Sequence, residues 1–201
     1  MILATVITCP RRWDHYRRFL RNFATVGLGM PVRTFQTKES AGDPYVNNNL
    51  NARAALAYGN RYLPDDGWLL YLEDDVAISP ALAPLLPELV RVGNAEGVDC
   101  WNICNRKNTV ARQFRLGDAV VNELEYPVSG AHGLLIPKRH LGAMLAAHWD
   151  QVSDLSMFAA INHPALKFWQ VVEPVLVEHI GHVSTYDPDQ RPKPLEVNHA
   201  D

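Results

Sequence analysis

WLLYLEDD, residues 68–75, is the stretch that decides the fold, because five apolar residues are followed directly by three acidic ones. A continuous apolar run of this kind predicts a strand buried on both faces, as in the interior of a parallel sheet. Three carboxylates at its end lose hydration unless a positive group compensates them. Ligands of open α/β sheets bind beyond the carboxyl ends of the strands. The stretch therefore indicates a site for a divalent cation and an anionic ligand, with a solvated acidic turn as the alternative.

The composition is that of one ordinary globular domain. The chain has 201 residues, of which 47% are hydrophobic and 20% charged, which is enough for a single well-buried core. The net charge of -3 gives no general argument for nucleic-acid or membrane binding. Two local groups of basic residues, within 11–21 and 106–115, are compatible with phosphate contacts or with solvated faces.

The cysteines and the apolar segments indicate the compartment. Cys9, Cys100 and Cys104 are an odd and sparse set without a CxxC pair, which argues against a disulfide framework and against a thiolate zinc site. We therefore expect a reducing, cytoplasmic setting, in a bacterium or a phage-infected host cell. Neither a signal peptide nor a transmembrane segment is expected from the sequence.

Strand and helix patterns alternate along the chain, which predicts an α/β fold with a mostly parallel central sheet flanked by helices. The polar segments 38–49 and 105–113 are expected to be loops, and prolines are expected to break or delay the helix after Ser79. Strands are expected at 2–8, 32–35, 68–72, 98–104, within 114–126, 133–136, 168–172 and 175–177. Helices are expected at 12–25, 50–62, 139–148 and 155–161.

A second polar feature lies at the start of the helix that precedes the apolar strand. Asn51 and Arg53 fall in NLNARA, residues 49–54. A helix N-terminus favours anions, and an arginine adds a planar pair of donors for phosphate. The alternative is capping by asparagine beside a surface arginine.

Together these segments resemble the GT-A family of nucleotide-sugar glycosyltransferases. The resemblance rests on the Asn-x-Ala-Arg helix, the apolar strand and the Asp-x-Asp-type motif that is here Glu73-Asp74-Asp75. The first strand with CPRR at 9–12, the SGAHG segment at 129–133 and the HIGHVS segment at 179–184 are also similar to parts of that family. The resemblance implies one GT-A domain over 1–201, with a nucleotide- and metal-binding half at 1–105, an acceptor-side half at 106–186 and an extended tail at 187–201.

The resemblance implies a role for each matching residue. Asp75 is expected to bind the metal, Mn²⁺ or Mg²⁺, together with His179, for which His182 is the alternative. The other matching residues are expected to contact the nucleotide, the donor sugar or the acceptor. The nucleotide and sugar contacts are expected from Thr8, Arg11, Asn51, Arg53, Glu73 and Asp74. Gly130 and His132 are expected on the side of the donor sugar and the acceptor.

The implied reaction moves a hexosyl or pentosyl group from a nucleotide-diphosphate sugar, with a UDP-sugar favoured, to a hydroxyl acceptor. Inversion requires a base, and Asp154, at a helix start after Ser153, is the candidate; an N-cap is its alternative role. The Glu-Asp pair that many family members carry before this helix is absent here. The acceptor is expected to be a glycan or a hydroxylated DNA base of the phage type.

Two other functions stay open from the sequence. A nucleotidyltransferase has the same need for metal and phosphate, but CPRR at 9–12 contains no glycine and does not form a lysine-bearing phosphate loop. A non-catalytic nucleotide-sugar-binding protein on the same fold is the third reading.

Overall fold

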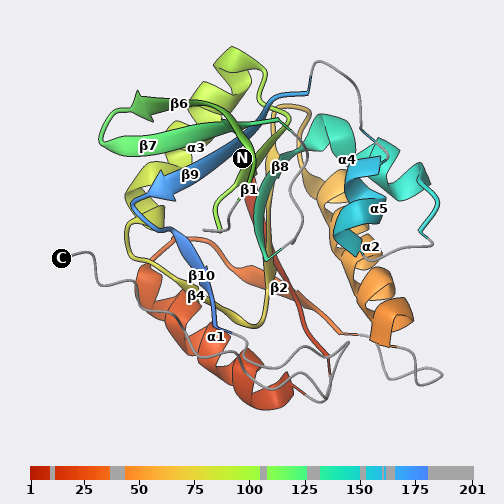
Figure 1. Cartoon of the computed structure of the whole chain (residues 1–201). Coiled ribbons are helices and arrows are strands. Elements are labelled where there is room, and N and C mark those ends of the chain that lie inside the picture. Colours follow the sequence, from red (N-terminus) through yellow and green to blue (C-terminus); the bar gives the residue numbers. More distant parts are fainter. Residues whose placement is uncertain are drawn as a thin grey trace.

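A mixed sheet of eight strands forms the centre of the computed structural model, which describes residues 1–9, 12–36, 44–104, 108–125, 132–149, 153–159, 161 and 166–180 (Figure 1). The order across the sheet is β2 (Val32–Phe35), β1 (Ile2–Ile7), β3 (Trp68–Glu73), β8 (Gly133–Pro137), β5 (Cys100–Asn102), β9 (Phe168–Glu173), β7 (Ala119–Leu124) and β6 (Val110–Leu116). Of these described strands, β8 and β7 run opposite to the other six. The α/β class is confirmed. Most of the described strands run in one direction, as expected, but the antiparallel pairings of β8 and β7 make the sheet mixed.

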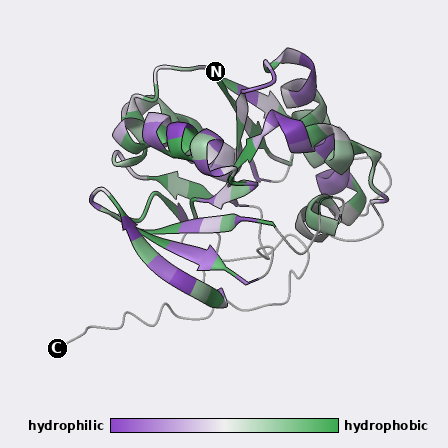
Figure 2. Cartoon of the chain, turned by 90° about the horizontal axis from the view of Figure 1, so that it is seen from above, coloured by the Kyte–Doolittle hydropathy of each residue, from purple (hydrophilic) through white to green (hydrophobic). Residues whose placement is uncertain are grey.

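Helices cover both faces of the sheet. α1 (Trp13–Val26) and α3 (Leu82–Glu96) pack on one face, and α2 (Pro44–Tyr62), α4 (Lys138–Ala146) and α5 (Ser153–Ala159) pack on the other (Figure 1). The helices carry hydrophilic and hydrophobic residues in alternation (Figure 2), as expected when one side faces the sheet and the other faces solvent. The sheet is thus the middle of three layers.

The strand β3 joins the two apolar layers. Trp68, Leu70 and Leu72 belong to the cluster on the α1 and α3 side, whereas Leu69 and Tyr71 belong to the cluster on the α2 side. All five side chains are fully buried, because alternate residues of a strand point to opposite faces and both faces are covered. The predicted strand at 68–72 is therefore confirmed, and its carboxyl end is fixed in the middle of the sheet.

A small second sheet lies beyond that carboxyl end. β4 (Val76–Ile78) follows β3 after the two-residue turn at Asp74 and Asp75, and it pairs antiparallel with β10 (Val177–His179). The pairing sets His179 opposite Val76. A segment about a hundred positions further along the chain is thereby brought beside the acidic turn.

Three expectations for local structure were wrong. α2 begins at Pro44, inside the expected loop, and β6 occupies part of the expected polar loop at 105–113. β6 is polar because it is the edge strand of the sheet, where most side chains face solvent. α3 is continuous through Pro84 and Pro87: Pro84 stands in the first turn, where no backbone donor is needed, and Pro87 removes one hydrogen bond only. The expected tail at 187–201 lies outside the described residues.

Candidate metal and nucleotide site

The site lies at the carboxyl ends of β1 and β3, where the two strands run parallel and in register from Ile2 and Trp68 to Ile7 and Glu73. Thr8 follows β1, and Asp74 and Asp75 follow β3, so the parallel pairing places these side chains beside one another. All three are buried. The apolar strand thus carries its acidic end into the protein and not into a solvated turn.

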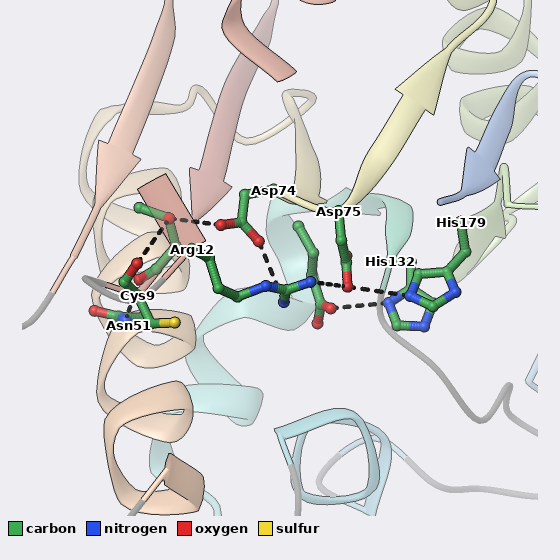
Figure 3. Close-up of polar contacts among 9 residues, drawn as sticks. Cys9, Arg12, Asn51, Asp74, Asp75, His132 and His179 are labelled. Atoms are coloured by element: carbon green, nitrogen blue, oxygen red, sulfur yellow. Dashed lines mark hydrogen bonds and ion pairs between the residues drawn. The ribbon is translucent and has the colours of Figure 1, made fainter. Parts of the chain in front are cut away.

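Asp75, His132 and His179 form a group that fits a metal ion. One potential ligand atom of each residue lies within 4.8 Å of those of the other two. The His179 Nε2 is 3.1 Å from the Asp75 Oδ2, and the two imidazole rings stack with centroids 4.2 Å apart and an angle of 13° between their planes (Figure 3). The three residues come from separate segments of the chain.

Backbone pairing explains how these segments meet. The Ile180 N–H donates to the Asp75 carbonyl at 2.8 Å, which continues the pairing of β10 with β4 and places His179 over the acidic turn. The Glu73 N–H donates to the His132 carbonyl at 3.2 Å, which continues the antiparallel pairing of β3 with β8. Both histidines are therefore positioned by strand pairing and not by loop conformation alone.

Arg12, immediately before α1, bridges the two aspartates (Figure 3). Its guanidinium bonds to the Asp75 Oδ2 and lies 3.3 Å, through Nη1, from the Asp74 Oδ1. The same Asp75 oxygen also accepts from His179. Arg12 is the positive group that the buried carboxylates require in the absence of a metal.

The two aspartates are shifted in opposite directions. Burial raises the pKa of Asp74 to about 6, although the Arg12 charge and the hydrogen bond from the Thr8 hydroxyl, at 2.6 Å, both favour the ionised form. Burial also acts to raise the pKa of Asp75, but the hydrogen bond from His179 and the charge of Arg12 outweigh it and hold that pKa well below its usual range. Asp75 therefore stays ionised to a lower pH than Asp74, which makes it the better metal ligand of the two.

Glu73 supports His132. Its Oε2 lies 2.8 Å from the His132 Nδ1, and both side chains are largely buried. A carboxylate behind an imidazole is a common arrangement around metal-binding histidines, because it fixes the ring and increases the basicity of the ligand. Glu73 thus contacts the metal group through His132 and is not one of its three members.

Asn51 and Arg53, both on α2, lie in different environments. The buried Asn51 donates from Nδ2 to the Thr8 carbonyl at 2.9 Å, which ties α2 to the end of β1. Arg53 is exposed, and its guanidinium carbon lies 5.9 Å from the centre of the Trp149 ring. Of the two, Asn51 borders the acidic group.

The donor atoms fit a divalent cation. The Asp75 Oδ1 is buried and has no hydrogen-bond partner among the described residues, which is costly for an ionised carboxylate unless another ligand takes that position. A carboxylate with two imidazoles suits Mn²⁺ better than Mg²⁺, which prefers oxygen ligands. The residues present therefore match the expected metal, with Mn²⁺ favoured.

Several expected residues lie together, and some lie elsewhere. Thr8, Asn51, Glu73, Asp74, Asp75, His132 and His179 gather in this one site. His132, expected beside the donor sugar, lies in the metal group. Arg11, Gly130 and His182 are outside the described residues, and Asp154 is placed only as the second residue of α5.

Arg12 is the residue that sequence reasoning missed. The sequence led us to expect a phosphate contact from its neighbour Arg11, which lies outside the described residues, and gave Arg12 no role; in the structure Arg12 contacts both aspartates. The available signal was position: the residue that begins a helix after a parallel strand lies at the ligand-binding edge of the sheet.

Comparison with known proteins supports the fold. No family model matches the sequence, and no curated protein matches it. A crystal structure of a glycosyltransferase involved in the glycosylation of the major capsid of PBCV-1 is similar, with a TM-score of 0.53 and 10% identity over 90% of this chain and 94% of that chain. A mutant of Drosophila β-1,4-galactosyltransferase 7, in complex with manganese, UDP-Gal and xylobiose, has a TM-score of 0.55 and 14% identity over 96% of this chain and 75% of its own.

The fold and the comparisons together define the structural class. This chain has the α/β fold of GT-A glycosyltransferases, with a group of carboxylates and histidines at the carboxyl edge of its sheet. Among the described residues, no helix is long and apolar enough to cross a membrane.

Proposed function

We propose that this protein is a metal-dependent glycosyltransferase that moves a sugar from a nucleotide-diphosphate sugar, with UDP as the favoured nucleotide, to a hydroxyl acceptor. The observation that carries the proposal is the meeting of Asp75, His132 and His179 at the carboxyl end of the central strand. The similarity to a galactosyltransferase in complex with manganese, UDP-Gal and xylobiose supports a sugar donor and a glycan acceptor. The alternative acceptor is a hydroxylated DNA base, and the net charge of -3 favours a glycan over it.

Asp75 would hold the metal with the two histidines, and Glu73 would keep His132 in orientation. When bound, Mn²⁺ supplies Lewis acidity that offsets the charge developing on the leaving diphosphate. Arg12 contacts Asp75 beside the metal group, so its guanidinium would stabilise the negative charge of a diphosphate bound there.

The residues at the end of β1 would hold the nucleotide. Thr8 and Asp74 are joined by a hydrogen bond, and Asn51 bonds to the Thr8 backbone, so the three form one rigid wall of the site. Carboxylate and hydroxyl oxygens in such a wall suit the hydroxyl groups of a ribose or sugar. On the basis of the sequence resemblance, Arg11 and Arg53 are proposed as further nucleotide contacts, and Gly130 is proposed on the side of the donor sugar and the acceptor.

Asp154 is proposed as the base that takes the proton from the acceptor hydroxyl, which would give inversion at the sugar. It stands in the first turn of α5, and α5 packs on the same face of the sheet as the Glu73 and His132 side chains. The variant Asp154→Asn should lower kcat by about a hundredfold or more while donor binding stays unchanged. An unaltered kcat would remove Asp154 from the mechanism and with it the argument for inversion.

The test of the proposal is turnover of a panel of nucleotide sugars with and without Mn²⁺. The wild type should hydrolyse or transfer at least one donor, and Asp75→Asn should abolish that activity because a neutral amide is a weak metal ligand. Asp66→Asn is the matched control, since Asp66 is exposed in the turn at the opposite end of the same strand. Unchanged turnover in Asp75→Asn would contradict the metal site. Consumption of a nucleoside triphosphate with a sugar phosphate would instead indicate a nucleotidyltransferase.

A further inference from the structure

A row of four carboxamide side chains crosses the sheet beside the metal group. The strand pairings set Asn102 of β5 against Gln170 of β9, Gln170 against Asn122 of β7, and Asn122 against Gln113 of β6. Residues paired in this way point to the same face of a sheet. The row therefore continues over four adjacent strands, for about 14 Å at the usual spacing between strands.

The row lies on the same sheet face as the Glu73–His132 pair. Leu134 of β8 pairs with both Tyr71 and Asn102. Glu73 comes two residues after Tyr71, and His132 comes two residues before Leu134, at the same end of the sheet. Two residues of a strand correspond to about 7 Å. The amide row thus begins about two residues along the strand direction from the Glu73–His132 pair, and it extends across the sheet toward the edge strand β6.

The neighbouring row on the other side is apolar and covered. Cys100 pairs with Phe168, and the Phe158 ring of α5 packs edge-on against Phe168 with centroids 5.0 Å apart. Amides in the next row interrupt an otherwise apolar face, and burying amides without need is unfavourable. The change from apolar side chains to amides thus occurs in the row that lies nearer the metal group.

Gln170 is used within the protein, since its Nε2 donates to the Cys104 carbonyl and its Oε1 accepts from the Asn108 Nδ2, both at 3.0 Å, whereas Asn102 and Asn122 keep donor capacity. Gln113 donates from Nε2 to the Asn122 Oδ1 at 2.8 Å, and the Asn102 Oδ1 accepts from the Cys104 N–H at 2.9 Å. The Asn102 Nδ2 is fully buried and has no partner within the part of the chain that the structure describes. Among the described residues, no hydrogen bond leaves the Asn122 Nδ2 either. These unused donors lie along one line, with exposure rising from Asn102 to Gln113.

We propose that the outer end of this amide row, Asn122 and Gln113, binds the acceptor, that the buried Asn102 and Gln170 hold the row in place, and that the acceptor is an uncharged oligosaccharide. The inference rests on the proposed glycosyltransferase function and names the acceptor class of that same site. The Asn122 Nδ2 and the exposed Gln113 carboxamide offer a donor and an acceptor, which match the hydroxyl groups of a neutral sugar chain. The cation next along this face of β6, Arg115, bonds to the Asp118 carbonyl in the hairpin turn, so the row itself offers no charge to a phosphate backbone.

The test is binding of the purified protein to an array that carries uncharged oligosaccharides, sialylated glycans and duplex DNA. The wild type should bind at least one uncharged oligosaccharide, and Gln113→Ala and Asn122→Ala should each weaken that binding about threefold to tenfold, the effect of one or two hydrogen bonds. Gln113 is exposed, so its variant should fold even if Asn122→Ala does not. Arg112→Ala is the matched control, because Arg112 is the neighbour of Gln113 on the same strand and points to the opposite face.

Binding of UDP with Mn²⁺, measured by calorimetry in the same variants, separates this inference from the proposed function. UDP binding should be equal in wild type, Gln113→Ala and Arg112→Ala. A wild type that binds UDP but only sialylated glycans, only DNA or nothing on the array would overturn the amide row while leaving the donor site intact. Equal glycan binding in all variants, or equal loss in Arg112→Ala, would also overturn it. Failure to bind any nucleotide would count against the proposed function, and the array would still decide the glycan site.

Discussion

Asp99 joins three segments of the chain away from the metal group: its own segment before β5, the helix α4 and the residue before β9. Its Oδ1 lies 2.7 Å from the His140 Nε2 and accepts from Arg139 at 3.3 Å, and its Oδ2 accepts from the Lys167 N–H at 2.9 Å. Burial acts to raise the pKa of Asp99, but the hydrogen bonds from Lys167 and His140 outweigh it and lower that pKa. The ionised carboxylate is therefore more favourable in the folded than in the unfolded protein.

The variant Asp99→Asn should consequently lose stability in a pH-dependent manner. A carboxyl group with a depressed pKa in the folded state stabilises the protein above its ordinary pKa of about 4, and this contribution disappears as the pH falls through the lowered value. We expect a loss of about 1–3 kcal/mol in the free energy of unfolding at pH 7. The NH₂ group of an asparagine at this position would face hydrogen-bond donors of His140, Arg139 or Lys167, where the carboxylate accepts. Urea denaturation at pH 7 and at pH 3.5 measures the effect. The difference from wild type should shrink at the lower pH, and a constant difference would contradict the assignment; Asp118→Asn, on the exposed β6–β7 turn, is the control.

At the level of residues, the sequence predicted which side chains matter better than how they are arranged. Asp75 and His179 were expected together, and they do lie together. His132 was assigned to the sugar side because only strand pairing between β3 and β8 reveals that it faces Asp75, and antiparallel pairing of distant strands leaves no local signal. The contact of Arg12 with the aspartates was missed for a similar reason, since adjacent side chains before a helix differ only in direction.

At the level of elements, the contact between α3 and the sheet depends on a glycine. A Cβ at Gly93 would lie 2.7 Å from the Trp68 ring and 2.9 Å from the Trp101 Nε1, both fully buried. Such distances do not occur without displacement of one partner, and large rings inside a packed core have little room to move. Gly93 therefore sets the close approach of α3 to β3 and β5.

The substitution Gly93→Ala should destabilise the protein by about 1–3 kcal/mol despite the better helix propensity of alanine. Gly142 in α4 is the matched control: a Cβ there meets no atom within 4 Å, so Gly142→Ala should stabilise by about 0.5–1 kcal/mol. Thermal denaturation of the two variants should move the midpoint in opposite directions. A midpoint for Gly93→Ala equal to or above that of wild type would show that α3 can shift, and would contradict the tight packing.

Elements with a strong local pattern were predictable, and those defined by the sheet edge were not. The strand at 68–72 followed from its continuous apolar residues, whereas β6 has a polar composition and forms because β7 offers it a partner. The early start of α2 was hidden by its asparagines, which are poor helix formers in isolation. Two of them, Asn47 and Asn51, are buried where α2 meets the site, so tertiary contacts and not propensity decide this end of the helix.

At the level of the whole molecule, the proposed metal would link three segments that are distant in the chain. Asp75 precedes β4, His132 precedes β8 and His179 ends β10. The strand pairings that position them were not accessible from the sequence, although the alternating pattern was enough to predict the α/β class. A ligand that binds the folded state and not the unfolded state stabilises the entire fold by mass action.

Mn²⁺ should therefore raise the thermal midpoint of the protein. At a concentration of about a hundred times its Kd the gain is about 2.7 kcal/mol, which corresponds to about 5–10 °C for a chain of this size. Mg²⁺ should have a smaller effect because two of the three ligand atoms are imidazole nitrogens. His179→Ala should remove most of the Mn²⁺ shift, and its urea midpoint in EDTA provides the control for folding. Equal shifts in wild type and His179→Ala, or a Mg²⁺ shift as large as that of Mn²⁺, would contradict a site built from Asp75 and the stacked histidines.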